Sequence, residues 1–296
     1  MKRNVQIWIG FLVMGCLAVS TAGAQSKAVV AGVQAPVWLE RDGVKQPLQA
    51  GASLAPGDRL YTGKNARILL NMPDASTVKL GEHVKFEIRE LNAAPADQPF
   101  RGFLRVLAGA FRYTTSSAGK SRARELNVQV GTATIGIRGT DVWGRSGPQQ
   151  DLVCLLEGKI EISREGEPAV PMHEPLSVYT ATPKKPADPL SMIDTPTVQA
   201  LALETELTPG QGVMQGAGRY RVYLYLDRKE AKIRHRLKKL REDGYAAEIY
   251  TTSVAGETRY RIVIPYFATI DDAAAAGAQL AKRYRIDKEK VEVGEI

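Results

Sequence analysis

The stretch R-Y-R-V-Y-L-Y-L at Arg219–Leu226 decides the fold of the last quarter of the chain. Side chains alternate along it with a period of two residues, as expected for a half-buried strand. One predicted face of the strand is apolar and consists of Val222, Leu224 and Leu226. The other face carries Arg221, Tyr223 and Tyr225. The segment therefore predicts a strand with one covered face and one open face.

A helix is expected directly after this strand. Asp227 is placed to cap the helix N-terminus, with Glu230 three residues later as in a capping box. The predicted apolar stripe of the helix consists of Ile233, Leu237 and Leu240. Gly244 follows and is a typical residue for ending a helix.

Two further strands are expected at Ala247–Thr251 and Thr258–Ile264, joined by a short turn that contains Gly256. A second helix is expected from Thr269, and a last strand at Val291–Val293. The order β-α-β-β-α-β in about 75 residues predicts a ferredoxin-like, four-stranded antiparallel sheet with both helices on one face. Residues 219–296 are therefore predicted to form an α+β domain.

The sheet face away from the helices is predicted to be open, and we consider it the candidate ligand-binding surface. Its predicted residues are Arg221, Tyr223, Tyr225, Glu248, Tyr250, Arg261 and Val263. Tyrosines beside arginines on an exposed sheet can receive flat ligands such as sugar rings or bases. The alternative is that these tyrosines are ordinary strand formers that loops half cover.

The segment Y-R-I-V-I-P-Y-F at Tyr260–Phe267, followed by A-T-I-D-D-A, resembles the third strand and second helix of SPOR domains. This resemblance implies binding of peptidoglycan glycan strands without stem peptides, through the open sheet face. The chain departs from the family pattern at Tyr223 and Tyr225, where glutamine and glycine are expected. It also has Pro265-Tyr266 where the family has a glycine before Pro-Phe.

The first 24 residues read as a signal peptide. Lys2 and Arg3 precede an apolar run at Ile7–Leu17 that is too short to span a bilayer. Small residues before Gln25 suit a cleavage site, so export to the periplasm is expected. Lipoprotein anchoring at Cys16 is not favoured, because apolar residues continue after it.

Charge and cysteine content set further limits. The net charge is +8, and removing Lys2 and Arg3 with the signal peptide leaves +6, which favours contact with a polyanion. Removal of Cys16 leaves Cys154 alone, so an internal disulfide is excluded for the mature chain. Cys154 lies in L-V-C-L-L-E and is interpreted as a small core residue.

Residues 28–182 are predicted to form an all-β domain, either a sandwich or a wound β structure, because short strand patterns alternate with Gly, Pro and Asp turns. The expected strands include Ala66–Asn71, Thr77–Leu80, Val84–Ile88, Phe103–Leu107, Ala110–Tyr113, Leu126–Val130, Leu152–Leu156, Lys159–Ser163 and Leu176–Tyr179. A hairpin is also expected where Val37–Arg41 meets Asp42-Gly43.

Three phrases in this region resemble FecR-type periplasmic domains, in the same order and spacing. They are G-D-R-L-Y-T-G-K-N-A-R-I-L-L at Gly57–Leu70, I-G-I-R-G-T-D-V-W at Ile135–Trp143 and L-L-E-G-K-I-E-I at Leu155–Ile162. The resemblance implies a periplasmic β scaffold that in its family receives a signal and passes it through a membrane helix. No later apolar run here is long enough to span a membrane, so we expect a scaffold or partner-binding module.

Two segments allow both a structural and a functional interpretation. In Ile135–Trp143, Gly139 and Asp141 favour a tight structural corner over a binding loop. The basic helix at Lys229–Arg241 could dock on a polyanion or could simply present a solvated face. Between the domains, residues 183–218 are rich in Pro and Gly and are predicted to be a linker that is semi-extended at first and flexible later, with a short helix at Val198–Leu207.

Nothing in the sequence indicates catalysis. The histidines His83, His173 and His235 lack metal-ligand spacing, and no nucleophile motif is present. We therefore expect a non-enzyme without metal or cofactor. The leading hypothesis is an envelope protein, with a role in cell division, that binds peptidoglycan glycan strands and has an envelope protein partner for its β domain.

Two alternatives remain open at this point. One is a periplasmic sensory or regulatory protein that acts through a membrane partner. The other is a nucleic-acid-binding protein with an RNA-recognition-like sheet. The second is disfavoured, because the chain lacks the aromatic K/R-G-F/Y-G/A-F motif and carries an export signal.

Overall fold

The structure is a computed structural model that describes residues 27–92, 98–116 and 123–296. The predicted signal peptide at residues 1–24, including Cys16, lies outside the described residues.

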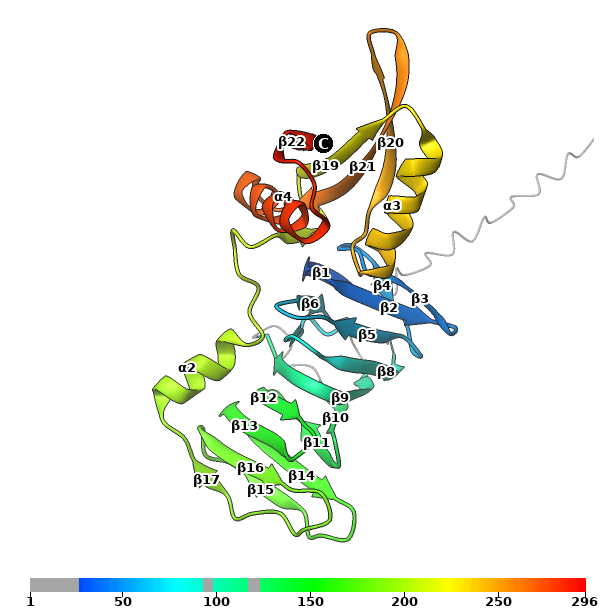
Figure 1. Ribbon diagram of the computed structural model, residues 1–296. Coiled ribbons are helices and arrows are strands. Elements are labelled where there is room, and N and C mark those ends of the chain that lie inside the picture. Colours follow the sequence, from blue (N-terminus) through cyan, green and yellow to red (C-terminus); the bar gives the residue numbers. More distant parts are fainter. Residues whose placement is uncertain (1–26, 93–97, 117–122) are drawn as a thin grey trace, which may run out of the picture.

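The N-terminal domain is a sandwich of two β-sheets, which Figure 1 shows stacked below the C-terminal domain. Sheet A contains, in spatial order, β1 (Ala28–Gln34), β6 (Arg67–Asn71), β7 (Thr77–Leu80), β9 (Phe100–Thr114), β12 (Asp141–Ser146), β13 (Asp151–Glu157), β16 (Ser177–Ala181) and β17 (Ser191–Met192). Sheet B contains β3 (Val44–Pro47), β2 (Val37–Arg41), β5 (Arg59–Thr62), β8 (Lys85–Leu91), β9, β10 (Arg124–Val130), β11 (Ala133–Ile137), β14 (Ile160–Arg164) and β15 (Val170–Met172). A short strand, β4 (Ser53–Leu54), pairs with β1.

Strand β9 belongs to both sheets. Its first part pairs with β8 and, in parallel, with β10, and its last part pairs with β7 and β12. The change occurs at Gly109, whose φ is +83° and whose added Cβ would lie 2.6 Å from a methyl carbon of Val84. The sequence predicted two strands here, because a glycine that bends one strand between sheets looks like a turn.

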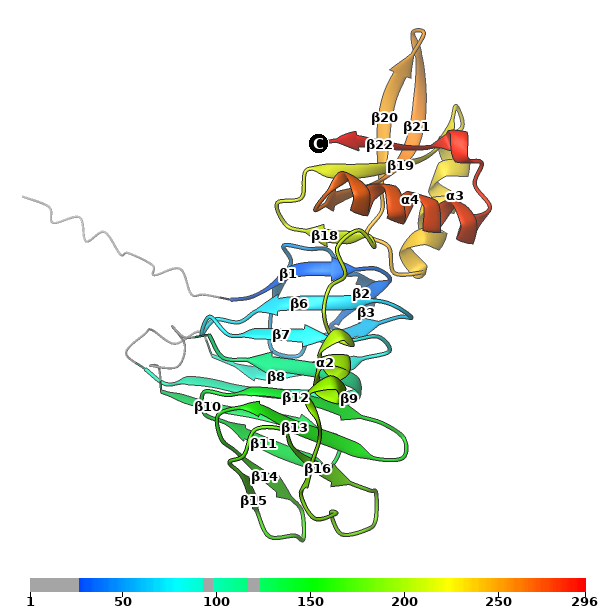
Figure 2. The same cartoon turned by 90° about the vertical axis from the view of Figure 1, so that its left-hand side faces the viewer.

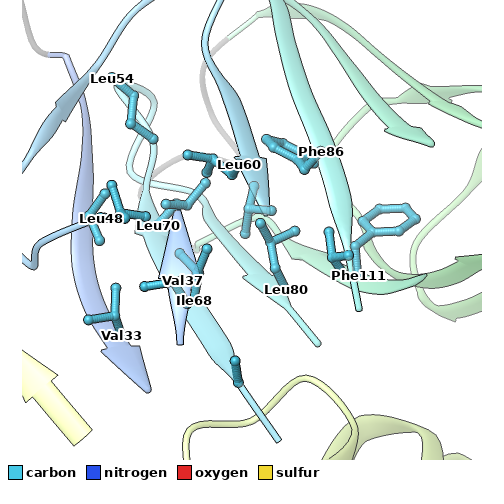
Figure 3. Packing of buried hydrophobic residues seen from close by; sticks show 14 of the residues in the cluster. Val33, Val37, Leu48, Leu54, Leu60, Ile68, Leu70, Leu80, Phe86 and Phe111 are labelled. Carbon is cyan, nitrogen blue, oxygen red and sulfur yellow. The ribbon is translucent and has the colours of Figure 1, made fainter. Parts of the chain in front are cut away.

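The domain core lies between the two sheets, and Figure 3 shows part of it. Sheet A contributes Ile68, Leu80 and Phe111, while sheet B contributes Leu60 and Phe86, each at most 1% exposed. The predicted all-β class of this region is confirmed.

The I-G-I-R-G-T-D segment forms a corner between two strands that the sequence did not predict, β11 and β12. Gly139 has φ +87°, and a Cβ on Gly158 would lie 2.9 Å from the carbonyl oxygen of Gly139. Asp141 accepts two hydrogen bonds from the guanidinium of Arg112, at 2.9 and 2.7 Å. The arrangement supports the structural interpretation of this segment.

The region predicted to be a flexible linker is packed along the outer face of sheet A, so that prediction is wrong. Helix α2 (Thr195–Leu203) covers a small cluster that includes Trp143 and Cys154. After the helix, Glu204 pairs with Arg145, and Thr205 is 1% exposed. The chain thus returns along the sandwich from its far end to β1, as Figure 2 shows. Local composition missed this because all of these contacts are long-range.

The C-terminal domain has the predicted β-α-β-β-α-β order. Its elements are β19 (Tyr220–Asp227), α3 (Glu230–Glu242), β20 (Glu248–Val254), β21 (Glu257–Phe267), α4 (Ile270–Tyr284), the 3-10 turn η1 (Lys288–Lys290) and β22 (Val291–Glu295). The antiparallel strand order is β22-β19-β21-β20. Buried residues of both helices, such as Ile233 and Leu280, share a core with Val222 and Leu224 of the sheet. The predicted fold class is confirmed.

One predicted cap is wrong. The N-cap position of α3 is Lys229, and the Asp227 carboxylate accepts a hydrogen bond from the Lys229 backbone N–H at 2.8 Å. Asp227 therefore closes the turn before the helix and does not cap it. By contrast, the Thr269 side chain caps α4 by accepting from the Asp272 N–H, and Gly244 follows α3 with φ +86°.

The two domains share direct contacts. Strand β18 (Val213–Gln215) pairs with β1 on one side and with β21 on the other. The indole N–H of Trp38 donates to the Glu242 carbonyl at 3.1 Å, and the Val37 N–H donates to the Gly244 carbonyl at 3.1 Å. The end of α3 is thereby held against the first strands of the sandwich.

Candidate aromatic and arginine surface on the open sheet face

Six of the seven residues predicted for the open face lie together on it. Tyr223 of β19 is paired with Val263 of β21, which is paired with Glu248 of β20. In the next row, Tyr250 is paired with Arg261. Arg221 precedes Tyr223 by two residues and so points to the same side.

Tyr225 does not belong to this surface, which corrects the prediction. The register shifts between Leu224 and Asp227, and Tyr225 has φ +58°. Its ring therefore turns to the helix side, where the guanidinium carbon of Arg236 lies 4.2 Å from the ring centroid. Burial there raises the pKa of the Tyr225 hydroxyl. The register shift is a β-bulge. It also leaves Leu226 43% exposed, whereas simple alternation placed this side chain on the covered face.

Two tyrosines lie where this chain departs from the resembled family pattern, Tyr225 near the first-strand glycine and Tyr266 directly after Pro265, which replaces the second glycine. Both residues adopt the left-handed backbone region, with φ +58° and +70°. Glycine enters this region without the steric cost that a Cβ imposes. These two tyrosines therefore bear the steric cost that glycine would avoid.

The centre of the surface is a cluster of two tyrosines and two arginines. The rings of Tyr223 and Tyr250 are 5.5 Å apart at 57°. The guanidinium carbons of Arg261 and Arg221 lie 4.4 and 5.2 Å from the centroid of Tyr223. Tyr223 is thus engaged by both arginines, whereas Tyr250 is contacted by Arg221 and is 39% exposed, so it offers an accessible aromatic ring.

Strand β22 adds residues that the sequence did not single out. Glu292 pairs with Arg261 at 2.8 Å, and the backbone carbonyl of Glu295 accepts from the Nε of Arg221 at 2.8 Å. A Cβ on Gly294 would lie 3.2 Å from the ring of Tyr223, so the glycine leaves room for this ring. The alternation in V-E-V-G-E was the available signal for placing Glu292 and Gly294 on one face.

The other two predicted residues differ in accessibility. Val263 is 7% exposed and forms the floor of the surface, so it offers little contact area to a ligand. Glu248 is exposed at the start of β20 and borders a groove beside α3. Arg261 is 13% exposed and paired with Glu292, so the surface that a ligand can reach is centred on Tyr250 and Arg221.

The cluster has the chemistry of a binding surface. It offers an exposed aromatic ring, guanidinium donors and a carboxylate, which suit a flat, polar and anionic ligand. Within residues 27–92, 98–116 and 123–296, no group of three His, Cys, Asp or Glu residues is arranged to hold a metal ion. None of the helices in the described part of the chain has the length and apolar character needed to span a bilayer.

Comparisons with known proteins agree with both resemblances. The family model for FecR protein matches residues 58–161, and the SPOR domain model matches residues 215–286. No curated protein matches the chain.

Two crystal structures of a candidate anti-sigma factor from Parabacteroides distasonis ATCC 8503 were matched. The first has a TM-score of 0.40 and 12% identity, and the match covers 80% of this chain and 99% of that chain. The second has a TM-score of 0.40 and 11% identity, covering 77% and 92%. From the family models, the chain carries a FecR domain followed by a SPOR domain.

Proposed function

We propose that this protein is a non-enzymatic component of the cell envelope that binds denuded glycan strands of peptidoglycan through the open face of its SPOR sheet. The SPOR match indicates peptidoglycan binding, and the FecR match indicates a periplasmic regulatory role. The preference for glycan strands without stem peptides and the residues that bind them are the finer parts of the proposal.

The observation that carries the proposal is the exposed ring of Tyr250 beside Arg221, whose guanidinium carbon lies 5.7 Å from its centroid. The apolar face of a sugar ring can stack on this tyrosine, while a guanidinium pairs with a carboxylate. The lactyl group of a denuded strand carries a free carboxylate. A stem peptide converts that carboxylate into a neutral amide, which would weaken pairing with Arg221.

The test uses the full-length protein and purified sacculi, untreated or stripped of stem peptides with an amidase. The wild type should bind stripped sacculi more strongly. Tyr250→Ala should lose roughly tenfold in affinity, the scale of one lost aromatic stacking contact. Arg221→Ala should lose the preference for stripped sacculi.

Two matched controls accompany these variants. Leu226→Ala truncates an exposed apolar side chain of β19, the strand that carries Arg221. Arg234→Ala removes an exposed arginine of α3. Both should bind like the wild type, with all variants keeping the same melting temperature. Equal binding by folded Tyr250→Ala and wild type would show that the surface does not bind glycan.

A second candidate role rests on the FecR match, which favours regulation. Here the FecR domain would receive a signal and act through a membrane partner. Deletion of the gene would then change transcription of specific genes and leave wall shape unaltered. A wall or division defect with unchanged transcription would favour the glycan-binding role.

A further inference from the structure

A groove of about 630 Å³ lies between the two domains, and the function proposed above does not use it. One wall is α3 of the SPOR domain, and the other is formed by β3 and the residues that follow it in the FecR domain. Figure 1 shows α3 standing beside the edge of the sandwich where β2 and β3 lie. The hydrogen bonds of Trp38 and Val37 to the end of α3 hold the two walls in place.

The SPOR wall carries a stripe of positive charge. Arg234, Lys238 and Arg241 line the groove, and their spacing of four and three residues places them on one side of the helix. Lys45 of β3 lines the groove from the other domain. One side of the basic helix α3 therefore borders a groove and does not face open solvent alone.

Two of these cations have no carboxylate partner among the ion pairs of the described residues. Arg241 uses its Nε to bind the Ala247 carbonyl at 2.8 Å. Lys45 places its Nζ 4.7 Å from the ring centroid of Trp38 and 4.4 Å from that of Tyr61. Both can therefore accept an anionic ligand without breaking an ion pair.

The groove has a net positive charge. Four cations line it, against the two carboxylates Glu242 and Glu248, which leaves +2. The ion pair between Lys238 and Glu242 is long, at 3.8 Å, and its side chains are 77% and 63% exposed. Exposed pairs of this kind contribute little and are readily exchanged for another partner.

The floor of the groove is apolar, which narrows the class of ligand. It includes Leu39, Leu48, Leu237 and Ala247. Leu39, Leu48 and Ala247 are at most 4% exposed, so the partly exposed Leu237 supplies the apolar contact area. A flat lipid surface cannot enter a groove, and a nucleic acid backbone gains nothing from an apolar floor. An acidic peptide with an apolar side chain satisfies both the charge and the floor.

Recognition would rest on side chains and not on strand addition. The exposed edge at β3 contains Pro47, which has no N–H to donate, and Lys45, a residue that protects edge strands. A strand added at this edge would therefore lack a backbone hydrogen bond at Pro47.

We propose that this groove binds an acidic segment of a partner protein. Carboxylates of the segment pair with Arg241, Lys238 and Lys45, and an apolar side chain lies on Leu237. Because both domains line the groove, the bound segment also strengthens the contact between them. This inference does not depend on glycan binding by the open face.

The probe is a short, fluorescein-labelled peptide of alternating glutamate and leucine, titrated with the full-length protein and followed by fluorescence anisotropy. Two comparison peptides carry glutamine in place of glutamate, or glutamate alone. The Glu–Leu peptide should bind, with affinity that falls as salt rises, and both comparison peptides should bind at least about tenfold more weakly.

The test variant is Lys45→Glu with Lys238→Glu, and its matched control is Lys229→Glu with Lys232→Glu. The control makes the same change in net charge on α3 residues that do not line the groove. The test variant should lose at least about tenfold in peptide affinity, and the control less than about twofold. Both should keep the wild-type melting temperature and sacculus binding.

Three results would overturn the proposal. Equal losses in both variants would mean non-specific attraction by net charge. Binding of the all-glutamate peptide as tight as that of the Glu–Leu peptide would mean a general polyanion site. Binding of anionic phospholipid vesicles that only the groove variant loses, without peptide binding, would assign the surface to a membrane.

Discussion

The Asp272 side chain is predicted to stabilise the contact between the SPOR domain and the segment that precedes it. The residue is 1% exposed in the first turn of α4. One carboxylate oxygen accepts from the backbone N–H groups of Gly212 and Val213, at 3.1 and 3.0 Å. The other accepts from the Thr269 hydroxyl at 2.7 Å. Replacing Asp272 therefore affects both the helix cap and the start of β18.

The magnitude follows from these three bonds. A hydrogen bond to a charged group contributes about 1.5–3 kcal/mol, and partial rehydration recovers some of the loss. Asp272→Ala also leaves two backbone N–H groups buried without an acceptor, so a loss of about 3–5 kcal/mol is expected. Asp272→Asn keeps an acceptor oxygen for Gly212 and Val213 but loses the charge and the acceptor of the Thr269 hydroxyl, so about 1–3 kcal/mol is expected.

The assay is urea unfolding of the full-length protein, followed by circular dichroism and by tryptophan fluorescence. Trp38 reports on the domain contact, because its indole N–H binds the carbonyl of Glu242. The control is Asp271→Ala, which removes the same charge from an exposed neighbour in the same helical turn. It should cost less than about 1 kcal/mol. If both alanine variants lost the same stability, the buried carboxylate would not hold the segment as argued.

The other predictions concern the FecR domain. Gly136→Ala should stabilise the protein by about 0.5–1 kcal/mol in thermal unfolding, because its backbone is not left-handed and a Cβ would meet nothing closer than 3.8 Å. Gly144→Ala should destabilise it by about 1–3 kcal/mol, since the Cβ would lie 2.5 Å from the ring of Phe111; the same sign for both changes would contradict this account. Burial raises the pKa of the Cys154 thiol from 9.0 to about 11, so a thiol reagent at pH 8 should label the native protein about a hundredfold more slowly than the unfolded chain. Since the folded state holds this proton more tightly, stability should fall as pH rises from 9.0 through about 11. Leu201→Asp, which disturbs the cover that α2 gives this cluster, should speed labelling of Cys154, and an unchanged rate would show that α2 does not protect it.

Local sequence patterns determined most of the strands and helices in both domains. Alternation along β19 correctly placed Val222 and Leu224 in the core, and each is 0% exposed. The Asp42-Gly43 signal correctly marked a hairpin turn, with φ +51° and +76°. These features depend on residues close in sequence, whose periodicity and backbone preferences can be read directly.

Pairing between residues distant in sequence decided the position of Tyr225 and the order of the interdomain segment, which local patterns could not predict. Tyr225 leaves the open face because β19 has one residue more than β21 between two paired positions, Leu224 with Ile262 and Asp227 with Tyr260. The Pro- and Gly-rich segment before the SPOR domain is ordered because its residues meet partners far away in the chain, such as Glu206 with Lys79.

The sequence by itself therefore determined two domain types, their order and most of the open-face surface. Only the tertiary structure decided that Tyr250, and not Tyr223 or Tyr225, offers the exposed ring, and that the basic stripe of α3 borders a groove. The physical reason is that register shifts and domain contacts are set by packing between residues distant in sequence, and local periodicity carries no information about these partners.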